Sequence, residues 1–144
     1  TPGEHRMEPV GEVAGVHFVN DSKATNPHAT LSALDGLERV VLIAGGQSKA
    51  LDLSPIARAE AVIGVVAIGE AAPRLDEAFS TAGLPVVRAA SMDEAVERAV
   101  AMAKPGDTVL LSPACASFDM FADYRARGEA FRAAVKRIRK GGSS

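Results

Sequence analysis

The chain has 144 residues, of which 47% are hydrophobic and 24% are charged, and its formal net charge is −2. This length suits one domain with one sizeable core and is too short for two substantial domains. The nearly balanced charge gives no bulk attraction to nucleic acid or to an anionic membrane surface, so we expect neither as a partner. No apolar run approaches the roughly 18 residues that a membrane-spanning helix requires.

Cysteine and histidine content limits the redox and metal chemistry of the chain. Cys115 is the single cysteine, so no intramolecular disulfide can form. The histidines, His5, His17 and His28, do not have the spacing of zinc ligands, and we expect no metal site. The N-terminal residues lack the apolar stretch of a signal peptide, which favours a cytoplasmic location. The chain begins without methionine and has no phosphate-binding loop, and we expect it to be a domain of a longer protein. A mature chain processed at its N-terminus is the alternative explanation of the missing methionine.

Six apolar stretches predict the strands of a sheet. The first two, residues 7–13 and 16–20, flank Ala14 and Gly15 and predict an antiparallel hairpin. The other four are short runs bounded by Gly, Pro or Ser, as is typical of strands buried on both faces of a parallel sheet. They cover residues 40–44, 62–68, 85–87 and 108–111.

Helix starts are marked by capping residues. Asn26 and Ser54 each precede a proline, so each is predicted to be an N-cap followed by proline at the first helical position. Ser91 and Glu94 have the spacing of a capping box, in which each side chain accepts a backbone N–H of the other residue. The helix that they begin is predicted to stop at residues 104–106, where the sequence is Lys-Pro-Gly.

The last helix is predicted over residues 122–139. Phe131, Val135 and Ile138 have helical spacing and predict its buried face, while Arg and Lys fill its other positions. We interpret the basic run at residues 136–140 as a solvent-exposed helix end that the macrodipole favours, rather than as a binding patch. Residues 141–144 are expected to form a flexible tail, so the folded domain should span residues 1–140.

The alternation of strands and helices predicts an α/β fold. We expect a Rossmann-like three-layer sandwich, with helices on both faces of a mostly parallel sheet of about six strands and an antiparallel strand added by the N-terminal hairpin. Sheets of this type bind ligands outside the carboxyl ends of their strands. Polar loops follow three of the predicted strands.

The first polar loop, residues 20–26, has the sequence N-D-S-K-A-T-N and leads into a helix. Lys23, Thr25 and the N-terminal amides of the helix suit an anionic ligand, and Asp21 suits a hydroxyl group or a cation. Helix capping by Asn26 and Asp21 is the alternative, but it explains neither Lys23 nor Thr25.

The second polar loop, residues 45–49, has the sequence G-G-Q-S-K. Its glycines allow the backbone to approach a ligand, and Lys49 supplies positive charge for a carboxylate or a phosphate. A surface lysine on a glycine turn remains the alternative. The chain contains no Gly-Lys pair, so it lacks the G-x-x-x-x-G-K-[ST] loop that holds nucleotide phosphates.

The third polar loop, residues 112–119, is rich in small side chains. They would let the hydroxyl of Ser117 and backbone N–H groups come close to a ligand. Cys115 has no histidine nearby in sequence to activate it, so we interpret it as a buried packing residue rather than as a nucleophile. Phe118, Phe121 and Tyr124 would line an apolar wall beside this loop or belong to the core.

Together these motifs resemble the Mur ligases of peptidoglycan synthesis, and among them the D-glutamate-adding members. The strings D-S-K-A-T-N and S-P-A-C-A-S are the most specific part of the resemblance. The matching stretches follow in order along almost the whole chain, at residues 5–8, 15–26, 45–49 with Asp52 and Ser54, 111–119 and 127–131.

The resemblance implies a three-domain enzyme of which this chain is the third domain. The two other domains would hold UDP-N-acetylmuramoyl-L-alanine and the ATP phosphates with Mg²⁺. The implied reaction turns the substrate carboxylate into an acyl phosphate, which the amine of D-glutamate then attacks. The chain alone is expected to be an inactive monomer that binds no cofactor tightly.

The resemblance also implies roles for particular residues. Lys23 would be catalytic, near the reacting phosphoryl and carboxyl groups, while Arg6 and Asp21 would bind the nucleotide. Tyr124 stands where familiar members carry Phe, so its contact with glutamate would gain a hydrogen bond or be lost. The residues implied to bind D-glutamate are Thr25, Lys49, Ser117, Phe118 and Tyr124.

A non-catalytic function is the alternative hypothesis. A stand-alone Rossmann-like module that binds a small anionic metabolite or a protein partner would also lack the phosphate loop. A hydrolase built on Cys115 is rejected because no base is available to activate the thiol.

Overall fold

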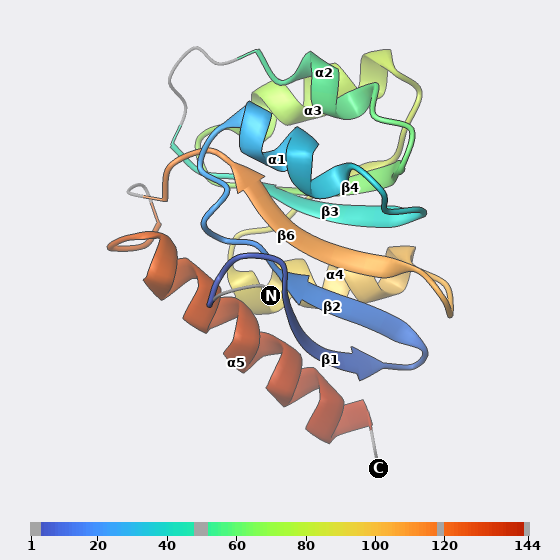
Figure 1. Ribbon diagram of the computed structural model, residues 1–144, viewed down its shortest axis with the longest axis vertical. Helices are drawn as coiled ribbons and strands as arrows, with labels where there is room; N and C mark the ends of the chain where they lie inside the picture. The colour runs from blue at the N-terminus through green and yellow to red at the C-terminus, as the bar shows by residue number, and fades with distance from the viewer. Residues whose placement is uncertain (1–3, 48–51, 118–119, 143–144) are drawn as a thin grey trace.

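The computed structural model describes residues 4–47, 52–117 and 120–142 of the chain (Figure 1). Strands and helices alternate along these residues, as the sequence predicts. They are β1 (Glu8–Val13), β2 (Val16–Asn20), α1 (Pro27–Leu34), β3 (Val40–Gly45), α2 (Ser54–Ala57), β4 (Val62–Ile68), α3 (Ala72–Thr81), β5 (Val86–Arg88), α4 (Met92–Met102), β6 (Thr108–Ala114) and α5 (Tyr124–Gly142). None of the helices in the described part has the length and apolar character to cross a membrane.

The strands form one sheet in the order β1-β2-β6-β3-β4-β5. β1 runs antiparallel to β2, and each of the other neighbouring pairs is parallel. β6 is the last strand in the sequence, yet it lies between β2 and β3. The predicted sheet, mostly parallel with an antiparallel hairpin strand, is therefore confirmed.

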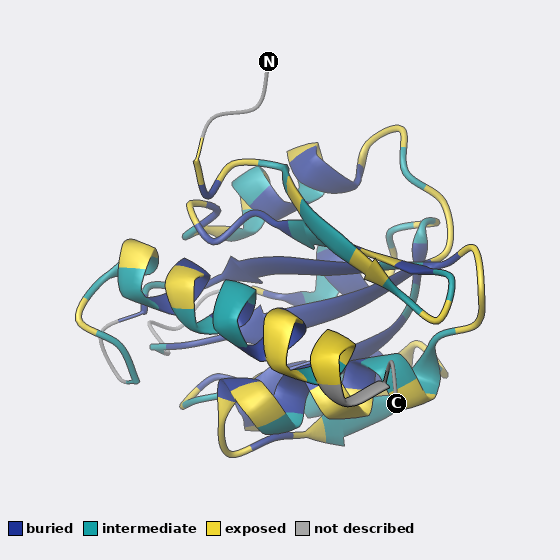
Figure 2. Ribbon diagram, turned by 90° about the horizontal axis from the view of Figure 1, so that it is seen from below, coloured by how far each residue is buried: buried dark blue, intermediate teal, exposed yellow. Residues whose placement is uncertain are grey.

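Helices cover both faces of the sheet and produce two cores (Figure 1). In β3, Leu42 and Ala44 pack toward α1, α2 and α3, whereas Val41 and Ile43 pack toward α4 and α5. Both sets of side chains are buried, which explains why this strand is apolar throughout. Figure 2 shows that α5 turns a buried side toward the sheet and an exposed stripe away from it.

Several predicted boundaries shift in the structure. β6 runs three residues past the predicted end at Leu111, because Gly45 at the end of β3 pairs with Ala114. β5 begins and ends one residue later than predicted. The start of α3 was not predicted, although Pro73 in its first turn is typical of a helix start.

Two of the predicted N-caps form, and in the capping box of α4 the second hydrogen bond has a different donor. Asn26 caps α1, because its side chain accepts a hydrogen bond from the N–H of Ala29 at 2.9 Å. Ser91 Oγ accepts from the N–H of Glu94 at 3.1 Å, as predicted for α4. The carboxylate of Glu94 accepts from the N–H of Ala90 at 3.0 Å, one residue before the expected donor.

The prediction that Ser54 is an N-cap is wrong. Ser54 is the first residue of α2, which has four residues, and Leu53 occupies the N-cap position without a side-chain hydrogen bond. The N–H and the hydroxyl of Ser54 donate to Asp52 Oδ1 at 3.1 and 2.6 Å. Ser54 therefore lies at the first helical position instead of the N-cap position, and its hydroxyl is a donor to Asp52.

The last helix also differs at both ends. α5 begins at Tyr124, two residues later than predicted, and Asp123 Oδ1 accepts a hydrogen bond from the N–H of Ala126 at 2.8 Å. The helix continues to Gly142, so two residues of the expected tail belong to it, and residues 143–144 lie outside the described residues.

The order of the strands brings the three polar loops to one edge of the sheet. The arrowheads of β2 and β6 point to this edge (Figure 1). The N–H of Asp21 donates to the carbonyl of Leu111 at 2.7 Å, which links the first loop to β6. The N–H of Gln47 donates to the carbonyl of Ala116 at 2.7 Å, which links the second loop to the third.

The close contact at Gly45 gives a prediction about stability. Gly45 has φ of +130°, and a Cβ atom there would lie 2.0 Å from the carbonyl oxygen of Ile68. Gly36 also has positive φ, +86°, but a Cβ there would meet nothing within 4 Å. We expect Gly45→Ala to lower the free energy of unfolding by more than about 3 kcal/mol, and Gly36→Ala by about 1 kcal/mol. Urea denaturation measures both, and equal losses would contradict the close contact.

Candidate functional site

Three residues singled out in the sequence line one pocket. Arg6, Asp21 and Lys23 lie around a cavity of about 380 Å³, together with Met7, Ala24 and part of α1. Arg6 and Lys23 are exposed and positively charged, whereas Asp21 is buried. A guanidinium, an ammonium and a carboxylate together suit an anionic ligand that also carries hydroxyl groups.

Asp21 is held by hydrogen bonds to both of its carboxylate oxygens. The N–H of Met7 donates to Oδ1 at 3.0 Å, and the hydroxyl of Ser112 donates to Oδ2 at 2.8 Å. Burial raises the pKa of Asp21, and these two hydrogen bonds and the charge of Arg6 partly oppose that rise. The alternative in which Asp21 caps α1 is wrong, because Asn26 is the residue that caps this helix.

Lys23 lies near an aromatic ring that comes from α5. Its ammonium is 6.0 Å from the centroid of the Tyr124 ring, and the guanidinium of Arg125 is 5.1 Å from the same centroid. Tyr124 also makes an edge contact with His5, with 6.0 Å between ring centroids. The N–H of Lys23 donates to the carbonyl of His5 at 3.0 Å, so Lys23 is anchored at its backbone.

The remaining predicted site residues lie in the three loops. Thr25 is half-buried in the loop that carries Lys23. Ser117 is buried, and its carbonyl accepts hydrogen bonds from the N–H groups of residues 120 and 121. Lys49 and Phe118 lie outside the described residues. Cys115 is buried in the core beside α1, α2 and α3, which agrees with the packing role predicted for it.

Arg127 is a buried residue beside the candidate site for which no role was predicted, although residues 127–131 belong to the family resemblance. It is 1% exposed, and its guanidinium donates to the hydroxyl of Ser22 at 3.0 Å, the carbonyl of Ser22 at 2.9 Å and the carbonyl of Cys115 at 2.8 Å. Arg127 thus joins the first and third loops to α5. The expectation that Arg and Lys avoid the buried face of this helix is wrong here. Arg127 precedes Phe131 by four residues, which places both on one face of the helix and would have predicted the burial of Arg127.

His5 is buried against α5, and the close approach depends on Gly128. A Cβ atom at Gly128 would lie 2.1 Å from His5 Nδ1. The side-chain amide of Asn20 donates to this nitrogen at 3.0 Å, so the neutral ring carries its proton on Nε2. His5 Nε2 faces Glu129 Oε1 at 3.6 Å.

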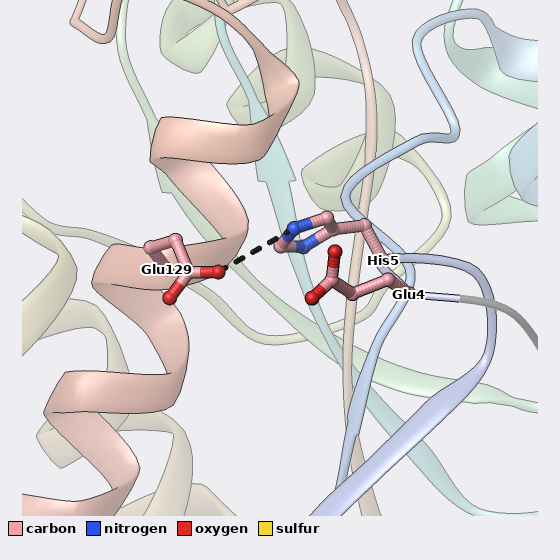
Figure 3. A group of neighbouring side chains, drawn as sticks. All are labelled: Glu4, His5 and Glu129. Carbon is pink, nitrogen blue, oxygen red and sulfur yellow. Dashed lines mark ion pairs between the residues drawn. The ribbon is translucent and has the colours of Figure 1, made fainter.

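Glu4, His5 and Glu129 form a group whose side chains are of the types that bind metal ions (Figure 3). Their potential ligand atoms lie within 4.8 Å of one another. The guanidinium of Arg132, however, pairs with Glu129 at 2.5 Å and with Glu4 at 3.4 Å. Because a cation already faces both carboxylates and His5 Nε2 carries a proton, this group fits an ion-pair network and not a metal centre.

The same arginine fixes the beginning of β1. Arg132 Nη2 and Nε donate to the two oxygens of Glu8 at 2.6 and 3.1 Å, and the amide of Asn20 donates to Glu8 Oε1 at 3.0 Å. Burial alone would raise the pKa of Glu8, but the hydrogen bonds from Arg132, Asn20 and the N–H of His5 outweigh it and lower the pKa. These contacts tie the N-terminal segment to α5.

Comparison with known proteins places the chain in a family. The family model described as Mur ligase, glutamate ligase domain, matches residues 5–115. The chain belongs to this family. It is 50% identical over 139 residues to the UDP-N-acetylmuramoylalanine–D-glutamate ligase of Nitrosococcus oceani, and 53% identical over 143 residues to that of Desulfotalea psychrophila. These alignments cover 93% and 96% of this chain but 30% and 31% of the relatives, so the chain spans less than a third of their length.

Solved structures of other Mur ligases share the fold. A murein peptide ligase from Psychrobacter arcticus matches with a TM-score of 0.63 at 16% identity, over 93% of this chain and 29% of that chain. A MurF ligase from Thermotoga maritima, solved in complex with ADP, matches with a TM-score of 0.52 at 16% identity, over 96% of this chain and 32% of that chain. These similarities confirm the predicted Rossmann-like fold.

The buried arginine gives a testable prediction. Arg127→Met would remove three hydrogen bonds and leave the carbonyls of Ser22 and Cys115 without these donors. We expect the free energy of unfolding to fall by about 3–5 kcal/mol. The matched control is Arg125→Met, which changes an exposed arginine on the same helix and should cost less than about 1 kcal/mol. Urea denaturation of the two variants compares them, and similar losses would refute the proposed role of Arg127.

The opposite pKa shifts of Glu8 and Asp21 predict opposite effects of pH on stability. The lowered pKa of Glu8 stabilises the fold above its unfolded value, about 4.5, and this contribution disappears as the pH falls through the folded pKa. The raised pKa of Asp21, from 3.8, makes its ionisation destabilising as the pH rises. At about pH 7 we expect Glu8→Gln to be less stable than the unmodified chain, and this difference should disappear by about pH 3. Over the same range Asp21→Asn should become less stable relative to the unmodified chain, because protonation of Asp21 stabilises only the latter. Urea denaturation at several pH values tests both, and parallel trends would contradict the assigned shifts.

Proposed function

We propose that this chain is the D-glutamate-binding domain of a longer ATP-dependent ligase that adds D-glutamate to UDP-N-acetylmuramoyl-L-alanine. The observation that carries the proposal is the identity of 50–53%, over almost the whole chain, to relatives with this named activity. The proposal includes a folded domain over residues 1–140, extended by the two further residues of α5, a cytoplasmic location and a monomeric state. The chain alone would be inactive, because it lacks a phosphate-binding loop.

The pocket beside α1 supports a nucleotide-binding role. Arg6 would pair with an anionic group of ATP, and the buried carboxylate of Asp21 would accept hydrogen bonds from hydroxyl groups. The donor set of this pocket therefore fits a nucleotide, although a phosphate loop from another domain would be needed to hold the phosphates. Mg²⁺ would be held outside the described part of this chain, since Arg132 already pairs with both carboxylates of the group around His5.

Lys23 would act through its charge. In the proposed reaction a substrate carboxylate takes a phosphoryl group from ATP, the amine of D-glutamate attacks the acyl carbon, and phosphate leaves as the amine loses a proton. Negative charge develops on the phosphoryl and acyl oxygens, and the exposed ammonium of Lys23 would stabilise it. The backbone hydrogen bond to His5 and the ring of Tyr124 limit where this ammonium can lie.

The meeting of three loops supports the binding of a dicarboxylic amino acid. D-glutamate needs cationic and hydroxyl donors for two carboxylates and must keep its amine free to attack. Hydroxyls of the first and third loops and the ammonium of the second would supply these donors. The proposed D-glutamate residues are Thr25, Lys49, Ser117, Phe118 and Tyr124.

The proposed role of Lys49 can be tested in the longer protein. Lys49→Ala should lower kcat/KM for D-glutamate about 30- to 1000-fold, because it removes a charge-assisted hydrogen bond worth roughly 2–4 kcal/mol. KM values for ATP and for the UDP-linked substrate should change little. The control is Lys104→Ala, which removes an exposed lysine before β6, at the opposite edge of the sheet, and should leave all three KM values unchanged.

Two results would contradict the proposal at different levels. An unchanged dependence on D-glutamate in Lys49→Ala would remove Lys49 from the binding site. Ligase activity of the unmodified longer protein that prefers L-glutamate or another amino acid over D-glutamate would overturn the proposed function itself. No ligase activity at all, with the protein folded, would favour the non-catalytic alternative.

A further inference from the structure

Behind the pocket, three polar side chains from three different elements meet in the interior. Ser112 of β6 is completely buried, and its Oγ lies 2.8 Å from Asp21 Oδ2 and 3.1 Å from Thr30 Oγ1. Thr30 of α1 is also completely buried, and its hydroxyl donates to the carbonyl of Ser112 at 3.0 Å. Ser112 thus lies between the end of β2 and α1.

The hydroxyl of Ser112 lies within hydrogen-bonding distance of two acceptors, Asp21 Oδ2 and Thr30 Oγ1. A serine hydroxyl has one proton, so it donates either to Asp21 or to Thr30. An ionised carboxylate is the stronger acceptor, and the hydroxyl of Thr30 has its own acceptor in the carbonyl of Ser112. The hydroxyl of Ser112 therefore donates its hydrogen bond to Asp21 Oδ2, and the hydrogen bond from Thr30 to the carbonyl of Ser112 holds the serine in place.

The carboxylate of Asp21 is consequently held at both oxygens. Ser112 holds Oδ2 and the N–H of Met7 holds Oδ1 at 3.0 Å. Each carboxylate oxygen can accept more than one hydrogen bond, so Asp21 keeps acceptor capacity for a ligand while its orientation is fixed. Asp21 lines the pocket, whereas Ser112 is not among the lining residues.

We propose that Ser112 is a positioning residue, which orients the carboxylate of Asp21 toward a nucleotide bound in this pocket. The inference rests on the nucleotide role proposed above for Asp21. Ser112 does not touch the ligand and acts through Asp21. Part of the third sequence motif therefore serves the nucleotide pocket, in addition to the D-glutamate role proposed for other residues of that loop.

Ser112 also helps to keep Asp21 ionised. Burial raises the pKa of Asp21, and the hydrogen bond from Ser112 opposes this rise. The charged groups that face the pocket around Asp21 are Arg6 and Lys23. The residues of α1 and β6 beside Asp21, which are Thr30, Ser32 and Ser112, are uncharged. Removing the serine hydroxyl should therefore make protonation of Asp21 easier.

The first test is steady-state kinetics of the longer protein. Ser112→Ala should raise KM for ATP about 10-fold, with kcat and KM for D-glutamate nearly unchanged. The rise in KM for ATP at acidic pH should begin at a higher pH than in the unmodified enzyme. Ser80→Ala is the control, because Ser80 is exposed on α3 and is not among the residues that line this pocket, and it should leave KM for ATP within about twofold.

The second test needs no activity. In the 144-residue chain, the ¹³C signal of the Asp21 carboxyl group, assigned by its loss in Asp21→Asn, can be followed against pH. Its titration midpoint should be higher in Ser112→Ala than in the unmodified chain, and unchanged in Ser80→Ala. Ser112→Cys, which keeps a weaker donor, should give an intermediate midpoint and replaces Ser112→Ala if that variant does not fold.

The outcomes separate this inference from the proposed function. If Asp21→Asn raises KM for ATP and Ser112→Ala changes neither this KM nor the titration midpoint, the positioning role of Ser112 is overturned and the nucleotide role of Asp21 stands. If Asp21→Asn leaves KM for ATP unchanged, the nucleotide role of Asp21 is overturned, and the inference fails with it.

Discussion

The buried guanidinium of Arg127 is the interaction on which the arrangement of the loops depends. Removing an arginine side chain from water is costly unless its N–H groups find acceptors. Here the acceptors are two oxygens of Ser22 and the carbonyl of Cys115, which belong to the loops after β2 and β6. The cost is offset only when both loops and α5 are in place together. The helix that closes the domain therefore also shapes the site.

The order of the strands explains why distant segments of the sequence form one pocket. β6 enters the sheet between β2 and β3, so the loops that follow these three strands meet at one edge. Asp21 and Ser112 are hydrogen-bonded although they are 91 residues apart in the sequence. A parallel sheet whose strand order changes direction leaves a crevice at this edge, and this is where such folds bind ligands.

The N-terminal segment completes the pocket and carries local strain. His5 and Met7 have φ of 61° and 46°, a conformation that costs a non-glycine residue roughly 1–2 kcal/mol each. The N–H of Met7 donates to Asp21, and His5 accepts hydrogen bonds from Asn20 and from the N–H of Lys23. Together with the pairing of Glu8 with Arg132, these contacts hold the segment in this form. The backbone thereby places Arg6 beside Asp21. Strained backbone of this kind is common at binding sites, where surrounding contacts hold a conformation that the segment alone would not favour.

The sequence by itself determined the strands, the first helix cap and the polar loops of the candidate site. The predicted bounds of β2 and β4 agree with the structure, because alternating and continuous apolar patterns are local properties. The predicted cap at Ser54 is wrong because Ser54 is the first residue of the helix, and its hydroxyl donates to Asp52. The tertiary structure alone decided that Arg127 is buried and that Ser112 pairs with Asp21. Such pairs depend on strand order and helix docking, and residues that are distant in sequence carry no local signal of which polar partner they will meet.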